Sequence, residues 1–436
     1  LDNLRDTGEL DNTLLFYIVG DNGSSAEGGP DGTYNEMLAL NGIVSNVSSQ
    51  LSHLEEWGSP STFPHFAVGW ALAGDTPFQW TKQVASHFGG TRNAMVISWP
   101  AGIPNAHGEL RSQFHHVIDV APTVLEAAGI PEPKIVDGTK QYPMDGISMV
   151  YTFADAKAPD RRKTQYFEMF GNRAIYHEGW VAATRHSIPW LMAENPPFDK
   201  DRWELYNIDE DFSEANDLAA QNPEKLKELQ EVFTKEAIHN HVYPLDDRRS
   251  ERFDAEIAGR PDLMGTRTSL TLHEGMTGMM ENAFISVKRR PYSVTAELEI
   301  PKGGANGVIL AQAGRFGGWS LYMKGGRVNE VYNYGGLEWT KVSSPQPLSP
   351  GTHTVLYEFV PDSPQPGAGG TSRLSVDGKQ VGEAKVPKTM PYAFSADEGA
   401  DVGMDNETPV SNDYKEGDNR FTGRILKVTV ETKKPS

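Results

Sequence analysis

Leu14-Leu-Phe-Tyr-Ile-Val19 is a continuous apolar run that ends in Gly20-Asp21-Asn22-Gly23. A strand that is apolar on both faces is typical of the middle of a parallel sheet covered by helices. Open sheets of this kind place their ligands beyond the carboxyl ends of the strands. We therefore expect an α/β domain in which Asp21 and Asn22 lie at the functional edge of the sheet.

The rest of the N-terminal half supports the α/β class. Further strands are predicted at Ala94–Ser98, Thr164–Phe170, Ala174–Tyr176 and Trp180–Thr184. Residues 122–128 and 223–238 are predicted helices, because each begins at or next to a proline and the first ends before Gly129. Residues 34–57 are also predicted to be mostly helical.

The pattern changes near residue 285. Tyr292–Ile300 alternates between apolar and polar residues, which is typical of a half-buried strand. Similar segments follow at Gly307–Ala311, Trp319–Met323, His353–Phe359, Thr371–Val376 and Arg424–Val430. Many short strands without helices favour an antiparallel sandwich. We expect an α/β domain over residues 1–245, an irregular linker over 246–284 and a jelly-roll-like β-sandwich over 285–436.

The composition excludes several classes of function. The formal net charge of -19 opposes binding to nucleic acid, whose phosphates require lysine and arginine. The absence of cysteine excludes disulfides, zinc–thiolate sites and a cysteine nucleophile in this chain. No apolar run approaches the roughly 20 residues that a membrane helix needs. A length of 436 residues makes two domains the default expectation.

Asp21 and Asn22 are the first candidates for chemistry. Adjacent carboxylate and amide oxygens at a strand end suit an oxygen-liganded cation. The alternative is a plain turn, because Asn-Gly and Asp-Gly sequences favour positive φ angles. The long apolar strand immediately before the pair favours the metal site.

A second candidate is the stretch from Thr76 to Asn93, which contains Lys82, His87 and Arg92. Cations grouped in this way suit a tetrahedral oxyanion. The alternative is that Lys82 is a solvated amine and Arg92 a structural ion pair. The adjacent histidines at 115 and 116 do not favour zinc, because neighbouring side chains rarely point at one ion; we expect one in the core and one hydrogen-bonded at the surface.

Four segments together resemble the formylglycine-dependent sulfatases of the alkaline phosphatase superfamily. In the family's order, they are Tyr17–Gly23, Thr76–Pro100, Phe114–Thr123 and Trp203–Asp211. The sequences of these segments are similar to those of bacterial arylsulfatases that carry a C-terminal β-sandwich. The resemblance implies a mixed, mostly parallel sheet flanked by helices and hydrolysis of sulfate esters.

The resemblance also implies site roles. Asp21 and Asn22 match two Ca²⁺ ligands of the family, and Lys82 matches the lysine that contacts the sulfate. His87 has no family counterpart and is a further catalytic candidate by proximity alone. Arg92 matches an arginine that we interpret as structural. The implied substrate is a small-molecule or glycan sulfate ester, and the implied compartment is the bacterial periplasm or the exterior.

The sequence departs from the family at the nucleophile. No cysteine is present, and Ser187-Ile-Pro189-Trp-Leu191 has leucine where the family's serine motif requires arginine. We therefore expect the formylglycine to lie upstream, and residues 1–8 resemble the end of a helix. The expected partner is the missing N-terminal part of the same protein, without which this chain should be inactive.

Two other functions remain open. A zinc phosphatase or phosphodiesterase of the same superfamily generally has histidine after the aspartate, where this chain has Asn22. A non-catalytic carbohydrate binder would use aromatic residues of the C-terminal region, such as Trp319, Tyr334 and Trp339. These aromatics are also typical of a sandwich core.

Overall fold

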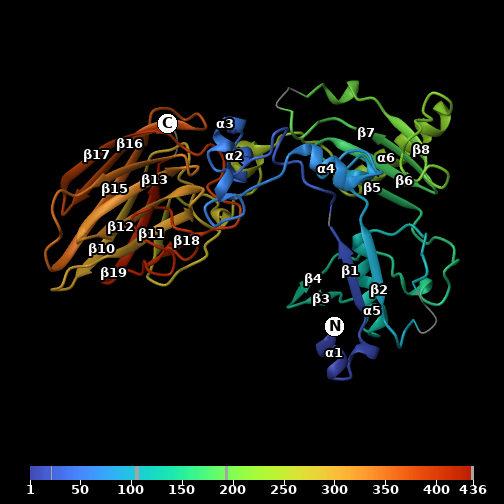
Figure 1. The fold of residues 1–436 in the computed structure, drawn as a ribbon, viewed down its shortest axis with the longest axis horizontal. Helices are drawn as coiled ribbons and strands as arrows, with labels where there is room; N and C mark the ends of the chain where they lie inside the picture. Colours follow the sequence, from blue (N-terminus) through green and yellow to red (C-terminus); the bar gives the residue numbers. More distant parts are fainter. Residues whose placement is uncertain (21, 104–107, 192–194, 434–436) are drawn as a thin grey trace. The chain divides into compact units, whose positions relative to one another are not determined.

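The structure, a computed structural model, describes residues 1–20, 22–103, 108–191 and 195–433 (Figure 1). The chain forms two compact units. Unit 1 contains Leu1–Ala26 and Val68–Asp247, and unit 2 contains Glu27–Ala67 and Arg248–Ser436. The sequence pattern gave no sign that residues 27–67 group with the C-terminal region, and we had expected them in the domain over residues 1–245.

The deciding apolar run forms a strand, as predicted, in unit 1. Strand β1 (Leu15–Val19) pairs with β2 (Ala94–Ser98) in a two-stranded sheet, with Leu15 opposite Ser98. The expected mostly parallel sheet is not found, because every pair of named strands in the described ranges is antiparallel. Tyr17 and Val19 are 62% and 52% exposed, so burial on both faces is not found either. An apolar run predicts that a strand packs against other parts of the protein, but it carries no information about whether the neighbouring strand is parallel or antiparallel.

A second sheet in unit 1 supports the loop that contains Lys82. Its strands lie in the order β5 (Thr164–Met169), β6 (Asn172–His177), β7 (Trp180–Thr184) and β8 (Glu204–Asn207). Helix α6 (Pro223–His239) packs on one face through Leu229, Phe233 and Ala237. The other face contributes Ala174, Tyr176 and Tyr206 to a cluster with Phe88. This sheet therefore lies between a helix and the loop of the candidate site.

Short elements complete unit 1. They are α1 (Asp2–Asp6), α4 (Val68–Asp75), α5 (Val120–Ala127), β3 (Ile135–Val136) and β4 (Thr139–Lys140). Helix α5 confirms the helix predicted over residues 122–128, and α6 confirms the one predicted over 223–238. None of the helices in the described ranges has the length and apolar character that crossing a membrane requires.

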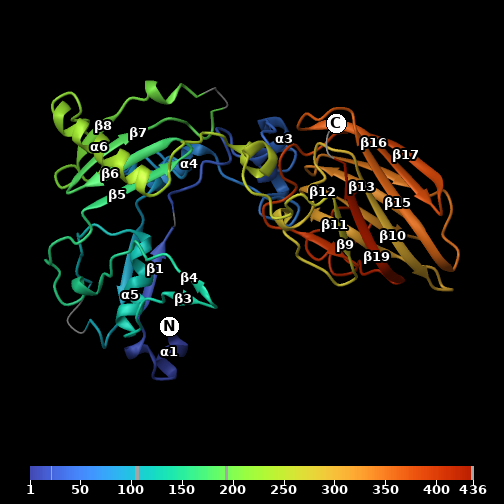
Figure 2. The ribbon, with the colours of Figure 1, turned by 180° about the vertical axis from the view of Figure 1, so that it is seen from behind.

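Unit 2 is a two-sheet sandwich, as predicted (Figure 2). One sheet has the order β17 (Lys379–Lys388), β16 (Ala368–Val376), β15 (Gly351–Pro361), β10 (Tyr292–Ile300), β19 (Arg424–Thr432) and β9 (Ser269–Leu272). The other has the order β14 (Glu338–Ser343), β13 (Arg327–Tyr334), β12 (Gly317–Lys324), β11 (Gly307–Gly314) and β18 (Ala400–Val402). One core joins residues of both sheets, including the fully buried Val294, Trp319, Tyr357 and Val428.

The segment over residues 27–67 is bound to the sandwich by side-chain amides. The long helix predicted over residues 34–57 is wrong: α2 (Glu36–Leu40) and α3 (Val47–Leu51) are short and separate. The helix is interrupted between α2 and α3 because Gly42 has φ of 69° and because the Asn46 side chain caps the start of α3. Asn41 donates to the Ala393 carbonyl at 2.9 Å and accepts from the Tyr392 and Ala393 amides.

Candidate active site

The backbone after Asn22 packs against the loop that contains Lys82. The Lys82 amide donates to the Ser24 carbonyl over 3.1 Å. Gly23 has φ of 81°, and a Cβ atom there would lie 1.9 Å from the Gly89 carbonyl oxygen. Only glycine allows this close approach. Two segments that the sequence singled out separately therefore lie side by side.

The side-chain oxygen of Asn22 fits a metal ligand. Its Oδ1 atom is buried and has no hydrogen-bond partner among the described residues. A buried polar atom without a partner costs about 1–3 kcal/mol, and a hard cation would satisfy it. Asp21, the other predicted ligand, lies outside the described residues. Across the described part of the chain, no group of three His, Cys, Asp or Glu side chains is placed to hold a metal ion.

The loop around Lys82 has a strained backbone. Trp80 and Gln83 have φ angles of 68° and 73°, which non-glycine residues rarely adopt. The loop is held in this shape by Asn172, whose side chain donates to the Gln83 carbonyl at 3.1 Å. Lys82 itself is half-buried. Strained residues of this kind collect at functional sites and persist only when the surrounding structure fixes them.

His87 has a different environment from that of a catalytic acid. It is 1% exposed, and its Nε2 atom lies 2.9 Å from the Glu204 carboxylate. Its Nδ1 atom lies 2.8 Å from the Ser86 hydroxyl. The hydrogen bond from His87 is the largest influence on the pKa of Glu204, which it lowers. Because both ring nitrogens are engaged away from solvent, this geometry favours a structural role for His87 over the catalytic role considered from the sequence.

Arg92 lies among aromatic rings, which agrees with the structural interpretation. Its guanidinium carbon lies 4.0 Å from the centroid of Phe212 and 4.9 Å from that of Phe88. Burial lowers the pKa of Arg92, and the nearby Glu214 partly offsets the effect. Glu214 is fully buried, accepts from the Phe88 amide at 2.9 Å, and has a pKa raised by burial to about 7. The pair supports the backbone that follows Lys82.

A cleft of about 580 Å³ opens beside Asn22, and all of its walls belong to unit 1. Its lining includes Asn22, Gln83, Ala85 and Gly90. The rest of the lining consists of β5 and of side chains from its surroundings: His116, Ile118, Asp145, Arg162, Glu236, His239 and Asn240. The cleft is large enough for a small molecule. Lys82 and His87 are not among its lining residues.

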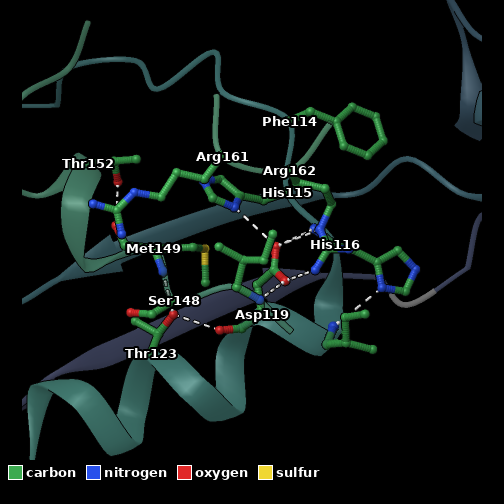
Figure 3. A network of polar contacts seen from close by, with 12 residues as sticks. Phe114, His115, His116, Asp119, Thr123, Ser148, Met149, Thr152, Arg161 and Arg162 are labelled. Atoms are coloured by element: carbon green, nitrogen blue, oxygen red, sulfur yellow. Dashed lines mark hydrogen bonds and ion pairs between the residues drawn. The ribbon is translucent and has the colours of Figure 1, made fainter. Parts of the chain in front are cut away.

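Asp119 is the centre of a buried polar network at this cleft (Figure 3). Its carboxylate accepts from Nε and Nη2 on one edge of the Arg162 guanidinium, from His115 Nδ1 at 3.1 Å and from the amides of His116 and Ile147. Burial alone would raise the pKa of Asp119, but these hydrogen bonds lower it well below its usual range. Asp119 and Arg162 were not among the site residues predicted from the sequence, although a polar Asp119 within an otherwise apolar helix start was a usable signal.

Ser187 is not placed as a nucleophile. It is 2% exposed, and its hydroxyl donates to the Phe170 carbonyl at 3.2 Å. Asn172 donates to the same hydroxyl at 3.3 Å, and its Oδ1 atom accepts from the Ser187 amide. These bonds fix the turn between β7 and the following loop.

Comparison with known proteins finds matches to two family models of sulfatases. The family model described as Sulfatase matches residues 1–130, and the model described as N-sulphoglucosamine sulphohydrolase, C-terminal, matches residues 80–241. An uncharacterized sulfatase of Schizosaccharomyces pombe is 29% identical over 53% of this chain and 39% of its own length. An arylsulfatase of Klebsiella aerogenes is 29% identical over 37% of this chain and 32% of its own length.

A solved structure gives a further match. It comes from work on glycosaminoglycan metabolism by Bacteroides thetaiotaomicron and is 18% identical, with a TM-score of 0.34, over 54% of this chain and 40% of its own. The chain thus spans about two fifths or less of the length of each of these three proteins. The two family models together match the segment that contains Asn22, Lys82 and the Asp119 network. These matches support a sulfatase of the alkaline phosphatase superfamily over residues 1–241 of this chain.

Proposed function

We propose that this chain supplies part of the active site of a calcium-dependent sulfatase that hydrolyses sulfate esters. The observation that carries the proposal is the buried, unpartnered Asn22 Oδ1 atom, beside a strained loop that contains Lys82. Members of the sulfatase family are generally metal-dependent. Asp21 and Asn22 would hold the Ca²⁺ ion, which when bound offsets negative charge on the sulfate group.

The proposed role of Lys82 is electrostatic. Hydrolysis breaks the bond between sulfur and the oxygen of the alcohol or phenol, while charge is redistributed over the sulfuryl oxygens. A lysine ammonium group placed near those oxygens stabilises the charge in the transition state. Its half-buried position strengthens the interaction, because the effective dielectric is lower than in water. The nucleophile in this proposal is a formylglycine hydrate outside the sequence of this chain.

The proposed partner is the remaining part of the sulfatase fold. The apolar residues that β1 and β2 expose, including Tyr17, Val19 and Val96, fit a covering layer. Calcium also prefers about six to eight oxygen ligands, more than Asp21 and Asn22 provide. We therefore expect no activity from residues 1–436 alone. A periplasmic or extracellular location is part of the same proposal.

The test compares esters and metals on the full-length protein that contains these residues. We expect release of 4-nitrophenol from the sulfate ester, loss of this activity with a calcium chelator, and recovery with Ca²⁺. Preferential hydrolysis of 4-nitrophenyl phosphate with Zn²⁺ would instead support a phosphatase.

The variant Lys82→Ala tests the lysine in the same assay. We expect kcat/KM to fall about 100-fold or more, which is typical for the loss of one charge-stabilising donor. The matched control is Lys200→Ala, because Lys200 is a surface lysine with a 71% exposed side chain. Equal activity of Lys82→Ala and the control would refute the proposed role of Lys82.

A further inference from the structure

His116 occupies an unusual position for a histidine. It is the N-cap of the short helix that leads into α5, where its ring accepts from the Ile118 amide and Asp119 accepts from the His116 amide. Ser, Thr, Asp and Asn are the side chains that suit this position best. Histidine at an N-cap is therefore expected where function requires a chemical group that the better capping side chains lack.

The ring of His116 presents a hydrogen-bond donor to the cleft. Its Nδ1 atom accepts from the Ile118 amide at 3.4 Å, which places the proton of a neutral ring on Nε2. Figure 3 shows the ring turned away from the Asp119 carboxylate, in contrast to His115. His116 lines the same cleft as Asn22 and Gly90.

The surroundings of His116 favour the neutral form of the ring. Burial lowers the pKa of His116, and the positive charge of Arg162 lowers it further, while Asp119 partly opposes this. The ring is also fixed by a tilted contact with Phe167, whose centroid lies 5.7 Å away. A neutral, fixed imidazole that donates through Nε2 is well suited to a negatively charged oxygen.

We propose that the Nε2 hydrogen of His116 binds an oxygen of the sulfate ester that occupies the Asn22 cleft. The proposal rests on the sulfatase function proposed above and adds a substrate-binding residue to it. Arg162 does not take this role, because its guanidinium already donates to Asp119, to Gln165 and to the Asp145 carbonyl. Arg162 and Asp119 instead fix the backbone from which the His116 ring extends.

The experiment separates capping from substrate binding in the full-length protein. His116→Asn and His116→Ser both keep an acceptor for the Ile118 amide and remove the Nε2 donor. We expect kcat/KM for 4-nitrophenyl sulfate to fall on the order of 10- to 100-fold in both variants, with the melting temperature unchanged. His116→Gln, whose amide nitrogen reaches the position of Nε2, should recover part of the loss. His273→Asn is the control, because His273 is an exposed histidine of unit 2 that does not line the cleft.

The outcomes distinguish this proposal from the sulfatase proposal. If the unaltered protein hydrolyses no sulfate ester, the proposed function itself fails. If it is active, and His116→Asn and His116→Ser keep its kcat/KM, the role of His116 is refuted. If both variants lose activity only in proportion to a loss of folded protein, His116 acts as a capping residue alone. That result also refutes its role in substrate binding.

Discussion

Tyr17 in β1 and Tyr357 in β15 both lie in antiparallel strands, yet Tyr17 is 62% exposed and Tyr357 is fully buried. The difference lies in what each sheet faces. The strands of unit 2 form two sheets that share one core, whereas β1 and β2 pair only with each other among the described strands. Apolar strands therefore identify surfaces that are expected to be buried. Which of these surfaces is buried depends on whether a second layer packs against it.

The largest expected effect is in the covered sheets. Trp319→Ala removes a fully buried ring that contacts Tyr292 and donates to Gln312 at 2.9 Å. We expect the free energy of unfolding to fall by about 3–5 kcal/mol, because the change leaves a cavity and an unpaired amide oxygen. Urea denaturation monitored by circular dichroism measures it. A loss below about 1 kcal/mol would show that the shared core is not the main source of stability in unit 2.

The next effect is expected in unit 1 at Asp119, the centre of the buried polar network. Asp119→Asn leaves the buried Arg162 without its anionic partner. Breaking a buried ion pair from one side costs about 3–5 kcal/mol, and we expect the lower end because asparagine keeps one acceptor. The loss should appear as increased proteolysis within residues 68–247 while the sandwich remains resistant. Equal cleavage of both units would contradict this separation.

Glu214 should make the stability of unit 1 depend on pH. Its pKa is raised by burial to about 7, above the usual carboxyl value of 4.5, so the folded state binds a proton that the unfolded state has lost. The stabilising contribution is complete below pH 4.5 and is lost as the pH rises through 7, at up to about 1.4 kcal/mol per pH unit. Glu214→Gln should remove this slope. An unchanged slope, measured by denaturation between pH 5 and 8, would contradict the assignment.

The smallest effect is expected in the uncovered strand. Tyr17→Ser changes an exposed side chain of β1, so the free energy of unfolding should change by less than about 0.5 kcal/mol. In the full-length protein, where we propose a covering layer, the same substitution should be clearly destabilising. Equal small effects in both proteins would remove the argument that this face is covered.

The sequence predicted local structure better than it predicted contacts. The bounds of β2, β7 and β10 agree with the predicted strands, because alternating or continuous apolar patterns depend on neighbours in the chain. The parallel pairing of β1 and the long helix over residues 34–57 were wrong, because strand direction and helix interruption depend on distant partners.

In the candidate site, too, local features were predicted better than contacts between distant residues. Motif order identified the segments that contain Asn22 and Lys82, and the close approach at Gly23 brings these segments together. The burial of His87 against Glu204 and the pairing of Asp119 with Arg162 join residues far apart in the sequence. No pattern within one segment contains that information. Asp21 remains a predicted ligand outside the described residues.

The path of the chain through residues 27–67 limits how this protein can be shortened or recombined. This segment joins Asn22 to Lys82, and its Asn35 and Asn41 side chains bind backbone groups of residues 335 and 392–393. Removing residues 248–436 would strip the segment of these anchors and leave a long, loosely held loop between two residues of the proposed site. The sandwich is therefore not a module that evolution or an engineer can exchange without also redesigning the loop it holds.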